Sequence, residues 1–203
     1  MQKQNGSPMG KLVNIHTHNP AKTEITIRTA GIHPYDAASA NATRLEAIER
    51  EAAEADAVGE IGLDFACDVS REEQEHVFRV QLSIAERLQK PVVLHCVRAF
   101  EPTMAMLDGV RLPAVIFHGF IGSPEQARRA VAQGYYLSFG ERTFRSPKSI
   151  EAMRSTPLSH LFVENDEAPT PIAELYERIA TLLGIETRVL EAQTAENFER
   201  IFG

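Results

Sequence analysis

Short apolar runs alternate with longer amphipathic segments along this chain, and this alternation restricts its fold more than any other feature. The runs that predict buried strands are residues 12–15, 24–29, 57–61, 92–94, 114–117, 135–138 and 161–163. The segments that predict helices are residues 43–55, 71–89, 124–133, 171–183 and 187–201. A repeated strand-then-helix order predicts an α/β fold with a parallel sheet, because parallel neighbours need a crossover connection. The periodicity leaves open whether this sheet closes as a barrel or stays open and doubly wound.

Length and composition favour one globular domain. The chain has 203 residues, of which 43% are hydrophobic and 24% are charged, and a domain of this size can bury a large core. Residues 1–10 carry neither helical nor strand periodicity, so we expect a disordered lead there and a single domain over residues 11–203. No apolar run approaches the ~18 residues that cross a bilayer, and no signal-peptide core is present. The sequence therefore predicts a cytoplasmic protein without a membrane partner.

Charge and cysteine content exclude several other classes of protein. The net charge of −7 argues against a protein that coats nucleic acid, because such binding draws on many Lys and Arg contacts to phosphate. This negative charge does not exclude an enzyme that binds phosphate through a metal ion. Cys67 and Cys96 are too few for a disulfide framework, and they form no CxxC pair of the kind that binds structural zinc. Nothing in the sequence predicts an oligomer.

Ionisable side chains gather where the predicted strands end. They are His16, His18, His33, Glu60, His95, His118, Glu164 and Asp166. The carboxyl ends of parallel strands share one face of the fold, so side chains far apart in the sequence meet there. His16 and His18 occupy alternate positions of an extended segment and therefore point the same way. Clustered imidazoles and carboxylates predict a metal centre that suits Zn, Mn, Fe or Ni, or Mg where substrate phosphate completes its shell.

These residues lie within motifs that follow one another along most of the chain. The motifs are Asn14-Ile15-His16-Thr17-His18, Gly31-Ile32-His33-Pro34, Gly59-Glu60-Ile61-Gly62-Leu63-Asp64-Phe65, Pro91-Val92-Val93-Leu94-His95, Phe117-His118-Gly119-Phe120-Ile121-Gly122-Ser123 and Glu164-Asn165-Asp166. In this order the chain resembles the TatD-type metal-dependent deoxyribonucleases, which belong to the amidohydrolase-like TIM-barrel group. The resemblance implies a TIM-barrel-like (β/α) barrel. Family members usually have several tens more residues between the first two motifs, whereas here only 14 separate His18 from His33. We therefore expect a contracted or distorted barrel of seven parallel strands with surrounding helices.

The resemblance also implies a role for each clustered residue. It implies one or two divalent metal ions per chain, with Mg, Mn and Zn as candidates. The implied ligands are His16 and His18 for one ion, Glu60 as a bridge, His95 and His118 for the second ion, and Asp166 as a further ligand. The implied catalytic residues are Asp166, which takes the proton of the attacking water, Glu60, and His33, which lies near the scissile phosphate. Two metals in such a set can stabilise the charge of an in-line displacement.

The implied activity is hydrolysis of phosphodiester bonds, with DNA or a small phosphodiester as substrate and 3′-5′ exonuclease action as the expected mode. We expect His33, Arg98, Arg142 and Arg145 to bind the substrate, since the arginines follow predicted strands and carry the charge that phosphate needs. Two alternatives remain open. The same barrel and metals could hydrolyse a small amide, lactone or phosphomonoester, because loops select the substrate. The contracted chain could also be a non-catalytic protein that binds a metal or a partner.

Overall fold

The computed structural model describes residues 11–203, so the predicted lead over residues 1–10 lies outside the described residues. The strands are β1 (Leu12–Val13), β2 (Glu24–Ile25), β3 (Thr29–Ala30), β4 (Ala57–Asp64), β5 (Val92–Val97), β6 (Val115–Phe117), β7 (Tyr136–Phe139) and β8 (Leu161–Val163). The α-helices are α1 (Ala42–Glu54), α2 (Arg71–Leu88), α3 (Phe100–Leu107), α4 (Pro124–Ala132), α5 (Pro147–Arg154), α6 (Ile172–Leu183) and α7 (Thr187–Phe202). The short 3-10 helices are η1 (Pro34–Ser39), η2 (Glu141–Arg145) and η3 (Leu158–His160).

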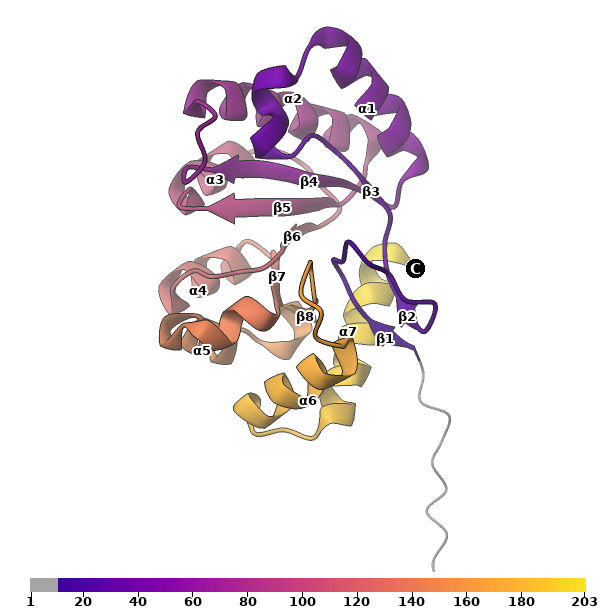
Figure 1. Ribbon diagram of the computed structural model, residues 1–203, viewed down its shortest axis with the longest axis vertical. Helices are drawn as coiled ribbons and strands as arrows, with labels where there is room; N and C mark the ends of the chain where they lie inside the picture. Colours follow the sequence, from indigo (N-terminus) through magenta and orange to yellow (C-terminus); the bar gives the residue numbers. More distant parts are fainter. Residues whose placement is uncertain (1–10) are drawn as a thin grey trace, which may run out of the picture.

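The strands follow one another in sequence order and all pair in parallel. Strands β3 to β8 form a six-stranded sheet, and β1 and β2 form a separate pair. The chain that leaves β1 runs beside the end of β8, where Ile15 N–H donates to the Val163 carbonyl at 3.2 Å and Thr17 bridges Asp166. Figure 1 shows this proximity and the helices that cover the outer side of the strands. The first strand is therefore joined to the last, as in a barrel.

The second predicted strand, residues 24–29, divides into two short strands. Its start, β2, pairs with β1, and its end, β3, pairs with β4 through Thr29 and Ala57. Between them the Arg28 carbonyl accepts from Asp56 N–H at 2.9 Å, and the Asp56 carboxylate accepts from Arg28 N–H at 2.7 Å. One extended stretch thus changes partners and links the strand pair to the larger sheet. The expected α/β barrel-like fold of parallel strands with surrounding helices is confirmed. The expected number of seven strands is wrong, because this stretch forms two strands and residues 11–203 therefore contain eight.

Helices form where the amphipathic pattern and its end signals agree. Helix α2 is capped at its start by Ser70, whose hydroxyl accepts from Glu73 N–H at 3.2 Å, and after its end by Gln89 in the left-handed region. Its apolar face buries Phe78 and Leu82 against β4. Burying one such side chain stabilises the fold by about 2 kcal/mol. This packing fixes β4, which carries the central residue of the site.

Two helices of the structure, α3 and α5, were not among the predicted segments. Each spans only 8 residues, about two turns, so its apolar positions are too few to define a period. Both follow strands and complete the strand-then-helix alternation. Within residues 11–203, no helix combines the length and apolar character that crossing a lipid bilayer requires.

Candidate metal centre

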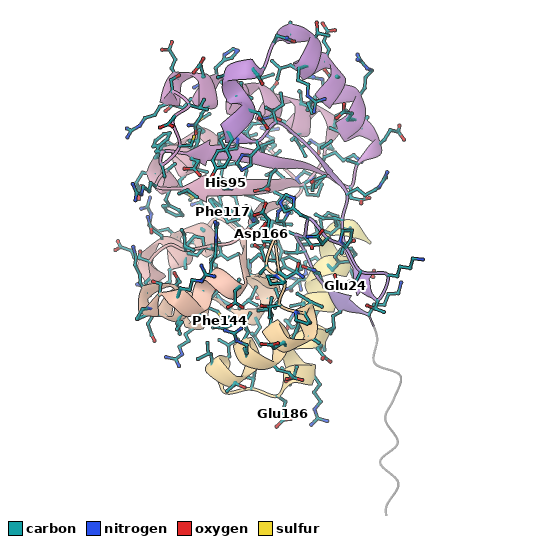
Figure 2. All side chains as sticks on the ribbon, viewed as in Figure 1. Glu24, His95, Phe117, Phe144, Asp166 and Glu186 are labelled. Atoms are coloured by element: carbon teal, nitrogen blue, oxygen red, sulfur yellow. The ribbon has the colours of Figure 1, made fainter. Side chains whose placement is uncertain are left out.

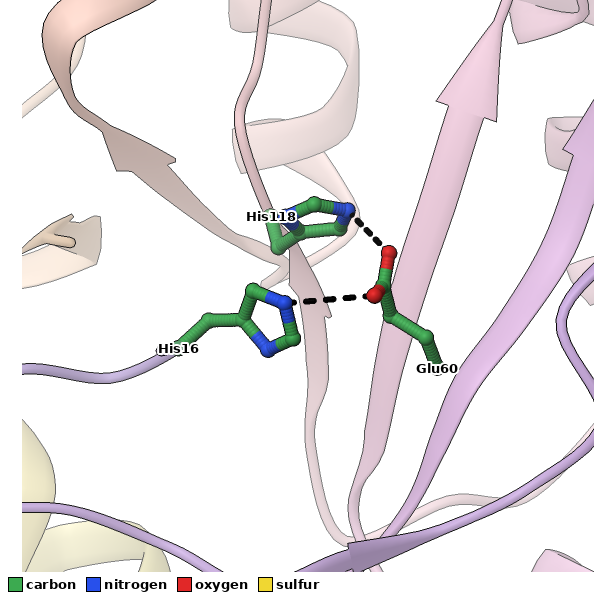
Figure 3. Close-up of side chains that lie close together, drawn as sticks. All are labelled: His16, Glu60 and His118. Atoms are coloured by element: carbon green, nitrogen blue, oxygen red, sulfur yellow. Dashed lines mark ion pairs between the residues drawn. The ribbon is translucent and has the colours of Figure 1, made fainter. Parts of the chain in front are cut away.

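Glu60 lies at the centre of a cluster of imidazoles and carboxylates. It projects from β4, and its side chain is 11% exposed. One carboxylate oxygen, Oε1, lies 2.6 Å from His118 Nε2, and the other, Oε2, lies 3.2 Å from His16 Nε2. Figure 3 shows both rings directed at this carboxylate from different strand ends. The two oxygens of Glu60 therefore face two separate groups of side chains.

The group around Glu60 Oε2 comes from the first and last strand ends. His16 Nε2 and His18 Nε2 lie 3.7 and 3.5 Å from Asp166 Oδ1, and His18 Nε2 lies 3.8 Å from Glu60 Oε2. The backbone holds this arrangement, since Asp166 N–H donates to the His16 carbonyl and His18 N–H to the Asp166 carbonyl. Asp166 adopts a φ of 52°, which is unusual for a residue other than glycine and fixes where its carboxylate points.

The group around Glu60 Oε1 comes from the ends of β5 and β6. His95 Nδ1 lies 3.1 Å from this oxygen and 3.3 Å from His118 Nε2. Figure 2 places His95 and Asp166, one from each group, near the middle of the molecule. Residues predicted from five different strand ends are thus brought together, as the shared face of a parallel fold requires.

Asp64 sets the proton position of His95. Its Oδ2 lies 2.9 Å from His95 Nε2, and both side chains are almost fully buried. A carboxylate accepts only, so Asp64 holds a proton on His95 Nε2, and Nδ1, which faces Glu60, is the nitrogen that remains for a metal ion. Burial raises the pKa of Asp64, but the hydrogen bond from His95 outweighs it and holds the pKa below its usual value. The buried Gln74 side chain in turn holds the Asp64 backbone at 2.7 and 2.9 Å.

Glu164 acts on His118 in the same way. Its Oε1 lies 3.2 Å from His118 Nδ1, and both side chains are buried. The proton on Nδ1 then faces Glu164, and Nε2 faces Glu60. Carboxylate–imidazole pairs of this kind orient the rings that ligate metals. Sequence reasoning placed Asp64 in a motif and Glu164 at a strand end but gave neither a role. Strand alternation offered a signal for Asp64, because it lies four residues after Glu60 on the same side of β4.

His33 directs a proton donor at the site, whereas His95 and His118 direct nitrogens that could ligate a metal ion. Its Nδ1 accepts a hydrogen bond from Tyr35 N–H at 3.2 Å, so the neutral ring carries its proton on Nε2. That nitrogen lies 3.8 Å from Glu60 Oε1. Burial, followed by the neighbouring His95, lowers the pKa of His33 to about 4, so the ring is neutral at pH 7. A donor N–H suits an oxygen of a substrate better than a metal ion.

Electrostatics in the cluster favour charged carboxylates beside protonated imidazole. Burial raises the pKa of Glu60, but the surrounding imidazoles, His118 first, outweigh it and hold the pKa far below the usual range. Burial lowers the pKa of His118, but the carboxylates of Glu164 and Glu60 outweigh it and raise the pKa to about 10. Burial and the nearby Glu164 carboxylate raise the pKa of Asp166. Asp166 is therefore a better base than an isolated aspartate.

The donor atoms fit divalent metal ions. Ligand atoms of His16, Glu60 and His118 lie within 4.8 Å of one another, as do those of His16, His18 and Asp166. His16 Nε2 is buried and lies 3.2 Å from Glu60 Oε2, but it forms no well-directed hydrogen bond within residues 11–203, which is costly for a polar atom that nothing else satisfies. Imidazole nitrogen and carboxylate oxygen together are ligands of Zn and Mn, and of Mg when phosphate contributes.

The three arginines expected to bind substrate lie beside this cluster. Arg142 and Arg145 line a cavity of about 200 Å³ together with Asp166. Arg98 lines a second cavity of about 390 Å³ that reaches His118. None of the three forms an ion pair with a carboxylate of the described chain. Their charges are therefore free to meet an anionic ligand.

A parallel α/β barrel whose strand ends carry clustered histidines and carboxylates defines the class of metal-dependent hydrolases. The family model of TatD related DNases matches residues 11–203, and the chain belongs to this family. This confirms the family predicted from the motifs and its class of ester-bond hydrolase.

Similar proteins of known name support the assignment. The 3′-5′ ssDNA/RNA exonuclease TatD of Cronobacter sakazakii is 34% identical over 200 residues, covering 86% of this chain and 76% of the relative. The protein of the same name from Escherichia coli K12 is 32% identical, covering 86% of this chain and 77% of the relative. The crystal structure of YJJV, a TatD homologue from Escherichia coli K12, superposes with a TM-score of 0.81 at 25% identity, covering 95% of this chain and 86% of that chain. A TatD family hydrolase from Entamoeba histolytica shares the fold, with a TM-score of 0.76 at 15% identity over 89% of this chain and 75% of that chain.

Proposed function

We propose that residues 11–203 act as one metal-dependent nuclease domain that removes nucleotides from the 3′ end of single-stranded DNA. The observation that carries this proposal is the shared carboxylate of Glu60, whose two oxygens serve two groups of imidazoles. The names of the relatives, which describe exonucleases of single-stranded DNA and RNA, support the choice of substrate and polarity.

We assign one ion to His16, His18, Glu60 and Asp166 and a second to Glu60, His95 and His118. Mg, Mn and Zn all match this mixture of nitrogen and oxygen donors. When bound, divalent ions would lower the pKa of a coordinated water and offset the negative charge of the phosphate. Asp64 and Glu164 hold protons on the outer nitrogens of His95 and His118, so the nitrogens that face Glu60 are the ones that would ligate a metal ion.

Proton transfer and phosphate binding are carried out by other side chains around the metal centre. Asp166 accepts the proton of the attacking water, since its pKa is raised towards the range where a carboxylate is an effective base. His33 donates from Nε2 to a phosphate oxygen and so favours the more negative transition state. Arg142 and Arg145 in one cavity and Arg98 in the other bind the phosphates on either side.

The test of this function uses purified protein that is stripped of metal and then given Mg, Mn or Zn. The substrates are bis(p-nitrophenyl) phosphate and single-stranded DNA, labelled in parallel at its 3′ or its 5′ end. We expect metal-dependent loss of the 3′ label first, and no turnover in Asp166→Asn. Turnover of only small amides, lactones or phosphomonoesters would favour the first alternative. Metal binding with no turnover of any substrate would favour a non-catalytic role.

Replacing Asp64 with asparagine is expected to weaken metal binding about 10- to 100-fold. Losses of this size are typical when a carboxylate that hydrogen-bonds a metal-ligating imidazole is removed. The amide can present its NH2 group to His95 Nε2, which then carries the lone pair while the proton moves to Nδ1. Titration calorimetry with Mn measures the effect. Asp68→Asn is the matched control, because Asp68 is an exposed acid four residues along the chain. Equal affinity in both variants would contradict the positioning role of Asp64.

Metal binding is expected to release a proton and to strengthen with rising pH. His118 in the metal-free protein has a pKa of about 10, so it carries an extra proton at pH 7 that a metal ion must displace from Nε2. For one displaced proton, affinity rises about tenfold per pH unit below that value. Calorimetry in buffers of different ionisation enthalpy counts the protons. Glu164→Gln removes the carboxylate that raises the pKa and should reduce the number released. Equal proton release by wild type and variant would contradict this prediction.

A further inference from the structure

Tyr35 differs from every other aromatic side chain of the chain. The sequence contains 10 Phe and 4 Tyr, all within the described residues, and only Tyr35 is exposed, with 56% of its surface accessible. A single exposed aromatic ring is common on protein surfaces and by itself indicates nothing. Its position is what matters, because it follows His33 and Pro34 at the start of η1, at the edge of the metal centre.

The ring of Tyr35 lies against the imidazoles of the site. Its centroid is 4.3 Å from that of His33 with the planes at 80°, and 5.9 Å from that of His95 with the planes at 70°. Burial raises the pKa of Tyr35, and the nearby Asp64 carboxylate raises it further, so the phenol lies close to that acid. One part of the ring is thus held by the site, and the rest faces solvent.

Other aromatic side chains near the motifs present little exposed surface to a ligand, although Phe120 helps to line the cavity beside Arg98. Phe120 is 5% exposed and packs in the core with Phe117 and Phe139. Phe65 is partly buried, and the Arg71 guanidinium lies over its ring at 4.4 Å. Tyr35 is therefore the aromatic surface at the edge of the cluster that can receive another planar group.

We propose that Tyr35 is a platform on which a nucleobase next to the scissile phosphate stacks. The inference rests on the proposed nuclease function and adds to it the part of the substrate that the metal centre cannot recognise. The nucleosides joined to a phosphate beside Glu60 and His33 would lie next to these residues, and Tyr35 is in contact with His33, whose Nε2 lies 3.8 Å from Glu60 Oε1. Stacking on an aromatic ring is available to every base, so this contact binds single strands without selecting sequence. In a duplex the bases are already stacked on one another, which favours single-stranded ends as substrate.

The side chain of Tyr35 can be changed without removing the hydrogen bond that holds the proton of His33 on Nε2. The hydrogen bond that sets the proton of His33 comes from the backbone N–H of Tyr35, not from its phenol. Tyr35→Ala removes the ring, and Tyr35→Phe keeps the ring while removing the hydroxyl near Asp64. The two variants therefore separate stacking from support of the metal ligands.

The first measurement compares two single strands of equal length, one natural and one with abasic sites at its three terminal nucleotides. We expect Tyr35→Ala to raise KM for the natural strand roughly 10-fold or more, as loss of one base–aromatic stack does. KM for the abasic strand should stay within about twofold, since that strand has no base to stack. Tyr35→Phe should resemble wild type on both strands. Equal losses on both strands would show a structural role and overturn the proposal, as would no loss on either.

A second measurement does not depend on turnover. The chain contains no Trp, so Tyr35→Trp introduces a single tryptophan at the proposed platform, whose emission can be excited selectively. In the Asp166→Asn background, we expect the natural strand to quench its emission and the abasic strand to leave it unchanged. Anisotropy of an end label reports binding of the strand independently. If the natural strand binds without quenching, the stacking proposal is contradicted and the nuclease proposal is not. Absence of any binding of the strand would contradict the nuclease proposal and the platform together.

Discussion

Replacing Glu60 with glutamine is expected to abolish phosphodiester hydrolysis while leaving the fold intact. Glutamine has almost the same shape, but it carries no charge and turns one of the two oxygens into an NH2 group. An NH2 group cannot ligate a metal ion, and it would replace one of the two oxygens, which lie 3.2 Å from His16 Nε2 and 2.6 Å from His118 Nε2. Losing the group that both metal sites share removes several kcal/mol of transition-state stabilisation, equivalent to roughly 10³-fold or more in rate.

The measurement is kcat/KM on 3′-labelled single-stranded DNA at saturating Mn, together with the metal content of the variant. The matched control is Glu46→Gln, which makes the same chemical change at an exposed position on α1. Circular dichroism verifies that both variants fold. Activity of Glu60→Gln within tenfold of wild type would show that the assignment of Glu60 as the shared ligand is wrong.

Saturating metal is expected to raise the thermal midpoint of unfolding by about 5–11 °C. A ligand at 100 times its dissociation constant stabilises the folded state by about 2.7 kcal/mol. A domain of about 200 residues gains roughly 2–4 °C for each kcal/mol. The ions stabilise the folded state because only the folded chain brings the carboxylates and imidazoles of the cluster together.

Differential scanning fluorimetry with and without Mn, and again after a chelator is added, gives this shift directly. We expect the shift to disappear in Glu60→Gln and to persist in Glu46→Gln. The same shift in wild type and Glu60→Gln would mean that the stabilising ions bind elsewhere. An unchanged midpoint in wild type would contradict the assignment of this cluster as a metal centre.

Much of the candidate site could be predicted from the sequence because strand ends in a parallel fold meet on one face. His16, Glu60, His95 and Asp166 are far apart in the sequence, yet each lies at or near the end of a predicted strand. In the structure Glu60 and His95 lie within β4 and β5, which extend further than predicted. Recognising the strands was therefore enough to predict that these side chains converge. The alternation rule for extended backbone also correctly paired His16 with His18.

The protonation of the rings could not be predicted in this way. It depends on which hydrogen-bond partner reaches each nitrogen, and those partners come from other elements or from the backbone. Asp64 reaches His95 across neighbouring strands, and Glu164 reaches His118 from β8 to β6. The backbone of Tyr35 makes His33 a donor instead of a metal ligand. Pattern reasoning sees residue types and spacing, whereas these contacts depend on angles and distances within about half an ångström.

By itself, the sequence determined the parallel α/β class, the family and the set of side chains that meet at the strand ends. Those properties follow from local periodicity and motif order, which each segment carries independently of the others. Only the tertiary structure decided how the contracted barrel joins its ends, because residues 24–30 change partners from β1 to β4. It also decided that Glu60 shares its two oxygens between two groups and that Tyr35 stays exposed beside them. Partner choice and exposure depend on what the rest of the chain places around a residue, and no single segment contains that information.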